Sequence, residues 1–388
     1  MTSRPLWLIG LFVAALALGT DEFVIAGLLP TIASDLAITT GTAGQLVTAF
    51  ALTFALGAPV MGVLFDPYPR RRVLLGGLVV FALANLAAAF APSFGLLLAL
   101  RVLAGLAAAV VSATAYAAAN QGAPKGKQGG YLAMVTAGLT VALFTGVPLG
   151  SWIGGLYGWR STFVLIAIVA VLALAAIAAR LPNLPGSPGG TLSDRLRPLH
   201  NTRVLRLVLA VFLSGSGGLM FYSYLAPILD GVHGSTGPLP LVLLLVGVVG
   251  VPSAFFGGWL ADKFGGRPSR LVVTGGHSLA LVLMAVLVFM GAPLPLFLIG
   301  VAIWSVFAWA LNPPLQSSTI EAAPDSAMGA VSLNISGLYL GTAVAGAAGG
   351  LIVDTIGQNW IPPIAAALLA LAFLSASFRT PKTQRPAA

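Results

Sequence analysis

Long, unbroken apolar segments are the feature of this sequence that most restricts its fold. The stretch Val164–Ala179 contains no polar side chain, and similar segments recur along the whole chain of 388 residues. Soluble domains carry about 25% charged residues, whereas only 7% of these residues are charged and the mean hydropathy is +0.99. Most of the protein surface is therefore expected to face lipid and not water.

Within a bilayer, the backbone polar groups must pair inside the segment, so that only helices and closed barrels can span it. Barrel strands alternate polar and apolar residues, and these segments do not. Each is close to the ~20 residues that a spanning helix requires. The sequence therefore predicts an all-α membrane protein whose twelve transmembrane helices cover residues 6–29, 42–65, 73–91, 94–118, 131–156, 161–179, 204–228, 239–261, 271–291, 294–315, 328–353 and 360–378. The first segment continues past Asp21 and Glu22 to Leu29, which favours an uncleaved helix over a signal peptide.

The positions of the basic residues predict the orientation. If the N-terminus is cytoplasmic, 17 of the 19 Lys and Arg residues fall in inner connections; Arg160 falls outside and Arg101 lies within a helix. This asymmetry follows the positive-inside rule. It predicts a multi-pass protein of the inner (plasma) membrane with both termini in the cytoplasm.

Short matches indicate that the chain is duplicated. Gly62–Asp66 matches Gly258–Asp262 at an offset of 196 residues, and Ala123-Pro124 matches Ala323-Pro324 at an offset of 200. We expect an N-terminal six-helix bundle over residues 1–180, a cytoplasmic linker over 181–203 and a C-terminal six-helix bundle over 204–388. Two pseudo-symmetric bundles around a central cavity are typical of transporters that bind substrate between their repeats.

Several functions are disfavoured by the same residues. The net charge of +9 resides in loops between the helices, so nucleic acid is not an expected partner. The three histidines, His200, His233 and His277, are far apart in the predicted topology, and there is no cysteine; we expect no metal, no cofactor and no enzyme active site. Inner loops lack the phosphate-binding Gly-x-x-x-x-Gly-Lys-Ser/Thr sequence, which argues against direct ATP drive.

Four motifs resemble those of the major facilitator superfamily. The inner-loop signature Gly-x-Leu-x-Asp with basic residues appears as Gly62–Asp66 with Arg70-Arg71-Arg72, and again as Gly258–Asp262 with Lys263, Gly265 and Arg267. In the first copy Pro67 and Pro69 replace the usual Arg and Gly. The fourth helix contains Arg101-x-x-x-Gly105, which is similar to the family's intramembrane arginine motif.

Two of the motifs resemble those of drug:proton antiporters. The fifth helix contains Gly146-Val-Pro148-Leu-Gly150 followed by Gly154-Gly155, with Ser151 where the antiporter motif usually has Pro. The string Gly19–Phe23, followed by Leu29-Pro30, resembles the twelve-helix arabinose-efflux and chloramphenicol-resistance exporters. The resemblance implies proton-coupled export of small drug-like, sugar-like or nucleoside-like solutes by a monomer that uses alternating access. Proton-coupled uptake is the alternative, and a membrane-embedded enzyme is a more remote one.

Ionisable residues within the membrane are functional candidates, because a charge there costs about 2.5–3.5 kcal/mol on insertion scales. Glu22 is expected about 12 Å, and Arg101 about 10 Å, below the outer surface, so an ion pair between their helices is possible. Asp21 and Glu22 point about 100° apart on a helix and cannot face Arg101 equally. Our hypothesis is that Glu22 is the main proton carrier, that Asp21 assists it, and that Arg101 tunes its affinity for the proton. The alternative is a static buried ion pair that only positions the first and fourth helices. His277 is expected near the inner end of its helix, snorkelling or hydrogen-bonded.

The remaining candidates concern conformation and substrate. Gly138, Gly146, Gly150 and Gly154 share one helix face and permit close backbone approach, and Pro148 should bend that helix. Asp66 and Asp262 lie beside basic residues at inner helix ends, where they could latch the outward-open state; the alternative is that the basic residues only set the topology. The predicted conformational residues are Gly62, Asp66, Arg70, Arg71, Gly138, Gly146, Pro148, Gly150, Gly154, Gly258, Asp262 and Arg267. The predicted substrate contacts are Phe23, Phe221, Tyr222, Tyr224, Trp304, Trp309, Asn312 and Asn334.

Overall fold

The protein is built from helices. The computed structural model describes residues 6–124, 127–187, 191–323 and 327–378, and within these ranges it contains no strand. Twelve helices in the described ranges are long and apolar enough to cross a membrane. The predicted all-α class and the predicted number of spanning helices are therefore confirmed. The inner-loop residues Arg4, Lys125, Arg379, Lys382 and Arg385, and Pro324 of the predicted repeat, lie outside the described residues.

The helices follow one another with short connections, and two of the described spans each consist of two α-helices, α5 with α6 and α13 with α14. The first half contains α1 (Trp7–Asp35), α2 (Thr40–Phe65), α3 (Arg70–Ala89), α4 (Phe94–Gln121), α5 (Gln128–Phe144), α6 (Gly146–Tyr157) and α7 (Trp159–Arg180). The linker region contains α8 (Leu192–Leu196) and the short 3₁₀ helix η1 (Arg197–His200). The second half contains α9 (Thr202–Ser223), α10 (Leu225–His233), α11 (Leu239–Phe264), α12 (Gly266–Phe289), α13 (Leu294–Ala310), α14 (Asn312–Ala322), α15 (Ala327–Thr355), η3 (Gln358–Trp360) and α16 (Ile361–Ala376).

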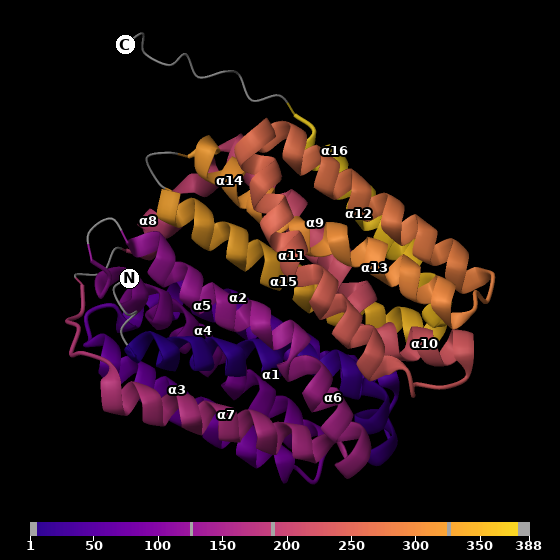
Figure 1. Ribbon diagram of the computed structural model, residues 1–388, viewed down its shortest axis with the longest axis horizontal. Coiled ribbons are helices and arrows are strands. Elements are labelled where there is room, and N and C mark those ends of the chain that lie inside the picture. The colour runs from indigo at the N-terminus through magenta and orange to yellow at the C-terminus, as the bar shows by residue number, and fades with distance from the viewer. Residues whose placement is uncertain (1–5, 125–126, 188–190, 324–326, 379–388) are drawn as a thin grey trace.

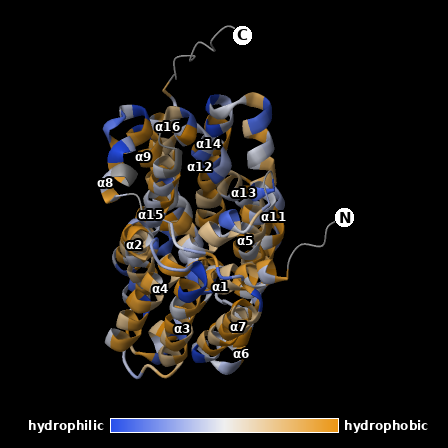
Figure 2. Ribbon diagram, turned by 90° about the vertical axis from the view of Figure 1, so that its left-hand side faces the viewer, coloured by the Kyte–Doolittle hydropathy of each residue, from blue (hydrophilic) through white to orange (hydrophobic). Residues whose placement is uncertain are grey.

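The two halves form two bundles that lie side by side, with α2 against α15 at their boundary (Figure 1). Figure 2 shows hydrophobic residues along the lengths of the helices and hydrophilic residues mainly near helix ends. We call the end that holds α8 the linker end, and the end that holds the α1–α2 connection the far end. The domain bounds 1–180 and 204–388 stay a prediction.

The backbone supports the duplication that the short motifs indicated. Gly158 precedes α7 with φ 84°, and Gly357 precedes η3 and α16 with φ 93°. The two glycines are 199 residues apart (357 − 158) and occupy the same place in each half. A residue with a side chain rarely adopts this backbone conformation, so both halves use the same turn before their sixth span.

The four predicted glycines of the fifth span all face α1. A Cβ atom at Gly138 would meet the backbone around Phe12, one at Gly146 the side chain of Thr20, one at Gly150 Val24, and one at Gly154 Leu28. These partners repeat along a single face of α1, so small residues let the two backbones approach closely.

The second half repeats this packing. A Cβ atom at Gly337 would lie 3.1 Å from Val208, and one at Gly341 would lie 2.8 Å from the amide nitrogen of Ser216. The eleventh span therefore packs on the seventh as the fifth packs on the first. The boundary between the halves is reached by another face of the fifth span, where Phe144 meets Gly247 of α11.

The fifth span is interrupted where the proline predicted a bend. Helix α5 ends at Phe144, Thr145 separates the pieces, and α6 begins at Gly146. Pro148 has no amide hydrogen for the carbonyl four residues earlier, at Phe144, and its ring crowds that carbonyl. The interruption lies beside the boundary between the halves.

Replacing Gly146 with Leu should destabilise the fold, because the new side chain must displace Thr20 and separate α6 from α1. We expect a loss of about 1–3 kcal/mol, measured as a lower melting temperature of the purified protein in detergent. Gly155→Leu is the matched control, because a Cβ atom there meets nothing within 4 Å. Equal losses for the two variants would contradict this packing.

Candidate functional site

The two acids at the middle of α1 point to different partners. The Asp21 carboxylate receives a hydrogen bond of 2.6 Å from Nη1 of Arg101, and both side chains are buried, at 0% and 1% exposure. Arg101 Nη2 also donates to the backbone oxygen of Asp21 at 3.4 Å. Asn85 of α3 lies beside the same carboxylate. The ion pair therefore joins α1 to α4 inside the first bundle.

A ring from α2 completes the surroundings of Arg101. Its guanidinium lies over the ring of Phe50, 4.4 Å from the centroid, in the arrangement of a cation–π contact. A Cβ atom at Gly105 would lie 2.8 Å from the backbone oxygen of Phe50. The glycine of the Arg101-x-x-x-Gly105 motif thus allows α4 to approach α2 closely enough for this contact.

Glu22 faces the second half of the protein. Tyr339 of α15 donates a hydrogen bond of 2.7 Å from its hydroxyl to Oε2 of Glu22. The Tyr339 ring stacks on Phe54 of α2, with centroids 4.0 Å apart and planes 20° apart. Among the described residues, Glu22 takes part in no salt bridge. Of the two acids, Asp21 is therefore the partner of Arg101, and Glu22 lies at the boundary between the halves.

Three aromatic residues gather next to Glu22, and we call them the aromatic cluster: Phe23 of α1, Tyr222 of α9 and Trp309 of α13. Their ring centroids lie 5.5–6.4 Å apart in edge-to-face arrangements. The Tyr222 hydroxyl donates to the backbone oxygen of Phe23 at 3.3 Å. Glu22, Phe23 and Tyr222 also line a cavity of about 10 Å³, which is about the space of one water molecule.

The other predicted substrate residues do not join this cluster. Phe221 and Trp304 are buried against each other, with ring centroids 4.9 Å apart. Tyr224 is buried at the boundary, where a Cβ atom at Gly44 of α2 would meet its hydroxyl, and it donates to the backbone oxygen of Gly346 at 2.6 Å. Asn334 is buried and its amide lies 3.5 Å from the Thr319 hydroxyl, whereas Asn312 is exposed at the start of α14. A mid-span position alone does not distinguish residues inside a bundle from residues at the boundary.

The expectation for His277 is wrong. Helix α12 begins at Gly266, five residues earlier than predicted, which places His277 three turns into the helix. Its side chain is 1% exposed, and in the described part of the protein neither ring nitrogen has a hydrogen-bond partner. A Cβ atom at Gly218 would lie 2.7 Å from its ring. His277 is therefore too deep to snorkel and packs in the space that this glycine leaves.

Two boundary contacts were missed by the sequence reasoning. Tyr339 was not predicted, although a tyrosine between Gly337 and Gly341 in the middle of a span needs a partner for its hydroxyl. At the far end, the Asp354 carboxylate accepts hydrogen bonds from the Thr39 hydroxyl at 2.6 Å and from the Gly41 amide at 3.0 Å. Asp354 of α15 thus caps the first turn of α2 across the boundary.

The inner-loop motif contacts the linker in its first copy. Arg70 pairs with Asp66 at 2.8 Å and donates to the Ser187 hydroxyl at 3.0 Å. The Ser187 amide donates to the backbone oxygen of Asp66 at 2.9 Å, and Arg71 donates to the backbone oxygen of Ala178. Gly62 lies in the last turn of α2.

The second copy of the motif repeats one of these contacts. Asp262 is exposed near the end of α11, and Arg267 donates to the backbone oxygen of Ser377 at 3.1 Å. A Cβ atom at Gly258 would meet nothing within 4 Å. In both copies an arginine therefore donates to a backbone oxygen at the end of the sixth span of its half, Ala178 or Ser377, and the first copy also contacts the linker through Arg70.

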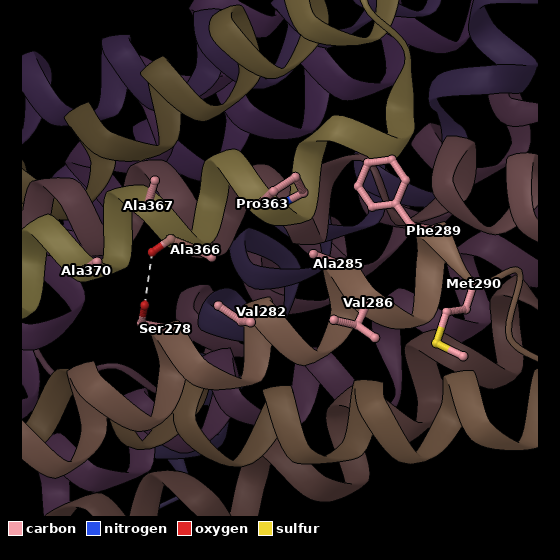
Figure 3. A pocket seen from close by; sticks show the side chains of 10 residues that line it. All are labelled: Ser278, Val282, Ala285, Val286, Phe289, Met290, Pro363, Ala366, Ala367 and Ala370. Carbon is pink, nitrogen blue, oxygen red and sulfur yellow. Dashed lines mark hydrogen bonds between the residues drawn. The ribbon is translucent and has the colours of Figure 1, made fainter.

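A larger groove lies away from this site, between α12 and α16 (Figure 3). It has a volume of about 540 Å³ and an almost wholly apolar lining, which includes the exposed side chains of Val282, Phe289 and Met290. Its one polar side chain, Ser278, donates to the backbone oxygen of Ala366 at 3.0 Å. The groove offers a polar solute only this one hydroxyl group, whose hydrogen is already bonded, and we do not assign the groove to the site.

Comparison with known proteins identifies the family. The sequence model of the Major Facilitator Superfamily matches residues 11–333. The chain belongs to this superfamily. Its members are transporters and not enzymes, so the protein moves small molecules across a membrane.

Relatives and a solved structure agree with this assignment. The chain is 34% identical to a chloramphenicol resistance protein of Streptomyces lividans, over 97% of each chain. It is 30% identical to the inner membrane transport protein YdhP of Escherichia coli (strain K12), over 95% of this chain and 94% of that protein. The crystal structure of a bacterial Spinster homologue, described as inward-facing and unoccupied, superposes with a TM-score of 0.75 at 16% identity and covers 96% of this chain and 98% of its own.

Replacing Asp21 with Asn should destabilise the first bundle strongly, because it leaves the Arg101 charge buried without a carboxylate. Breaking such a pair costs about 3–5 kcal/mol, which chemical denaturation in detergent would measure. Asp35→Asn is the control, because Asp35 pairs with Arg160 in an exposed position, where ion pairs contribute up to about 1 kcal/mol. Similar losses in the two variants would be inconsistent with a structural role for the buried pair.

Proposed function

We propose that this transporter exports small organic solutes in exchange for protons, and that Glu22 is its main proton carrier. The observation that carries the proposal is the position of the Glu22 carboxylate. It lies at the boundary between the two halves, beside the aromatic cluster and a small cavity, and is held by Tyr339 from the opposite half. A carboxyl group at that boundary can be reached from alternate sides as the halves rock.

The ion pair with Arg101 supports a different role for Asp21 in this proposal. An ionised carboxylate bound to a buried guanidinium is compensated as long as both charges are present. Releasing or binding a proton at Asp21 would leave Arg101 without its partner. We infer that Asp21 and Arg101 hold α1 against α4 and so fix the position of Glu22, which has no salt-bridge partner among the described residues.

The surroundings of Glu22 favour lipophilic or weakly polar substrates. The aromatic cluster offers apolar ring faces, and the lining of the adjoining cavity combines the apolar side chains of Ala26, Val47 and Leu219 with the hydroxyl groups of Ser223 and Thr342. Sites of this kind bind mainly through apolar contact, with a few polar groups that orient the ligand. The relative named as a chloramphenicol resistance protein supports a drug-like solute. Sugar-like and nucleoside-like solutes belong to the same proposal.

The contacts between the halves favour an inward-facing state. Within the described ranges, the hydrogen bonds that join the two bundles directly all lie between the far end and the middle of the protein. Those of Asp354 lie at the far end. The one nearest the linker end is made by Ser336, which donates to the backbone oxygen of Ala55 just past the midpoint of α2. With the predicted orientation, the far end is the outer face. We propose that this arrangement closes the outer side, and that Asp66 and Asp262 act as latches when the linker end closes.

Replacing Glu22 with Gln should abolish export driven by a proton gradient and preserve exchange of labelled for unlabelled substrate. The amide keeps the size and accepts the Tyr339 hydrogen bond, but it carries no exchangeable charge. Chloramphenicol and a panel of lipophilic drugs in proteoliposomes of defined orientation provide the assay. Asp35→Asn, with its carboxylate at the far surface, is the control and should transport normally. Undiminished gradient-driven export in Glu22→Gln would remove Glu22 from the coupling role. If the unmodified protein moves substrate in the opposite direction when the proton gradient is applied, it is an uptake symporter.

A further inference from the structure

We propose that Tyr339 is the positioning residue through which the charge of Glu22 controls the two halves of the protein. The inference rests on the proposed function, because it takes Glu22 as the group that gains and loses the proton. Its basis is the hydrogen bond of 2.7 Å that joins Tyr339 of α15 to Glu22 of α1. No motif of the sequence assigns a role to this tyrosine.

Each partner is fixed to its own half by close helix packing. On α1, a Cβ atom at Gly19 would lie 2.9 Å from Ala142 of α5. On α15, Gly337 and Gly341 on either side of Tyr339 pack against Val208 and Ser216 of α9. Neither helix can shift far without moving its bundle. Because each partner is fixed in its own bundle, the hydrogen bond holds the two bundles together.

Aromatic contacts connect this hydrogen bond to the buried ion pair. The Tyr339 ring stacks on Phe54, and the Phe54 ring stacks on Phe50 with centroids 6.4 Å apart. Phe50 in turn lies under the guanidinium of Arg101, which pairs with Asp21. The contacts form a closed path from one acid of α1 to the other, and they fix the direction in which the Tyr339 hydroxyl points.

A proton on Glu22 would weaken this connection. A phenol hydroxyl that donates to an ionised carboxylate makes a charge-assisted hydrogen bond, about twice as strong as one to a neutral group. The ionised form therefore stabilises the arrangement seen here, with the halves joined at mid-depth and at the far end. When Glu22 binds a proton, the halves lose part of that stabilisation and separate more readily.

Of the charged and titratable groups that face Glu22, Tyr339 is the one whose hydrogen bond depends on whether the Glu22 carboxylate carries a proton. Asp21 lies on the same helix, Arg101 on α4, Tyr222 on α9 and Tyr339 on α15. Asp21 and Arg101 are bound to each other, and Tyr222 donates to a backbone oxygen. Tyr116 of α4 is close to Tyr339 but bonds with Thr136 of α5 at 3.1 Å. Among the described residues, Tyr339 is thus the one side chain of the second half that donates a hydrogen bond to the Glu22 carboxylate.

A double-mutant cycle tests the proposal without depending on an identified substrate. The chain has no cysteine, so Gln121→Cys and Glu321→Cys can carry spin labels at the linker ends of α4 and α14, which are exposed. Pulsed electron paramagnetic resonance then measures the distances between the two labels, and the distance distribution gives the ratio of open to closed linker ends. Tyr339→Phe removes the hydroxyl and retains the ring on Phe54. In alkaline medium it should change this ratio about tenfold toward the closed form.

The Glu22→Gln background supplies the decisive comparison. There, Tyr339→Phe should change the ratio by about twofold or less, because the bond to a neutral amide is weaker. Tyr224→Phe is the matched control: it removes a buried hydroxyl that donates to the Gly346 backbone, so its effect should be the same in both backgrounds. Equal effects of Tyr339→Phe in the two backgrounds, or no effect in either, would overturn the proposal. The transport assay of Glu22→Gln alone tests the proposed function separately.

Discussion

Hydrocarbon solvates no polar group, and this constraint explains how the buried charges and most of the serine and threonine hydroxyls in the middle of the protein are paired. Inside a bilayer a charge needs a partner within the protein. Arg101 and Asp21 satisfy each other at 2.6 Å, with Phe50 over the guanidinium. The serine and threonine hydroxyls of the spans mostly return to backbone oxygens of their own helices, as Thr20 does to Leu16. Glu22 is different, because its partner belongs to the other half.

Adjacent positions on α1 thus serve two tasks. Consecutive helical residues point about 100° apart, so a helix that turns Asp21 into its own bundle directs Glu22 to the boundary. The ion pair makes α1 and α4 one unit, and the glycines of the fifth span bring α5 and α6 onto the same helix. Because the packing around α1 is rigid, a single hydrogen bond at the boundary can act on a whole bundle.

The two halves share their packing but not their chemistry. Close glycine contacts join the first span to the fifth and the seventh to the eleventh, and Gly158 and Gly357 make corresponding turns. The first half contains the buried ion pair, whereas the first, third and fourth spans of the second half contain Gly218, His277 and Trp304. The second half contributes aromatic rings and the Tyr339 hydroxyl. A duplicated scaffold therefore carries the buried ion pair of its mid-span region in one half and the Tyr339 hydroxyl that meets Glu22 in the other.

The sequence by itself determined the helices, their number and the superfamily, because spanning a bilayer requires long apolar runs and close packing requires recurrent glycines. It also selected Asp21, Glu22 and Arg101, since charges in such runs are costly. Only the tertiary structure decided which acid meets Arg101, because helix rotation and neighbouring helices set that choice. It also separated Phe23, Tyr222 and Trp309 from the aromatic residues buried inside the second bundle, and it placed Tyr339 on Glu22 across 317 positions of sequence. Contacts between distant segments depend on how the two bundles meet, which no local pattern records.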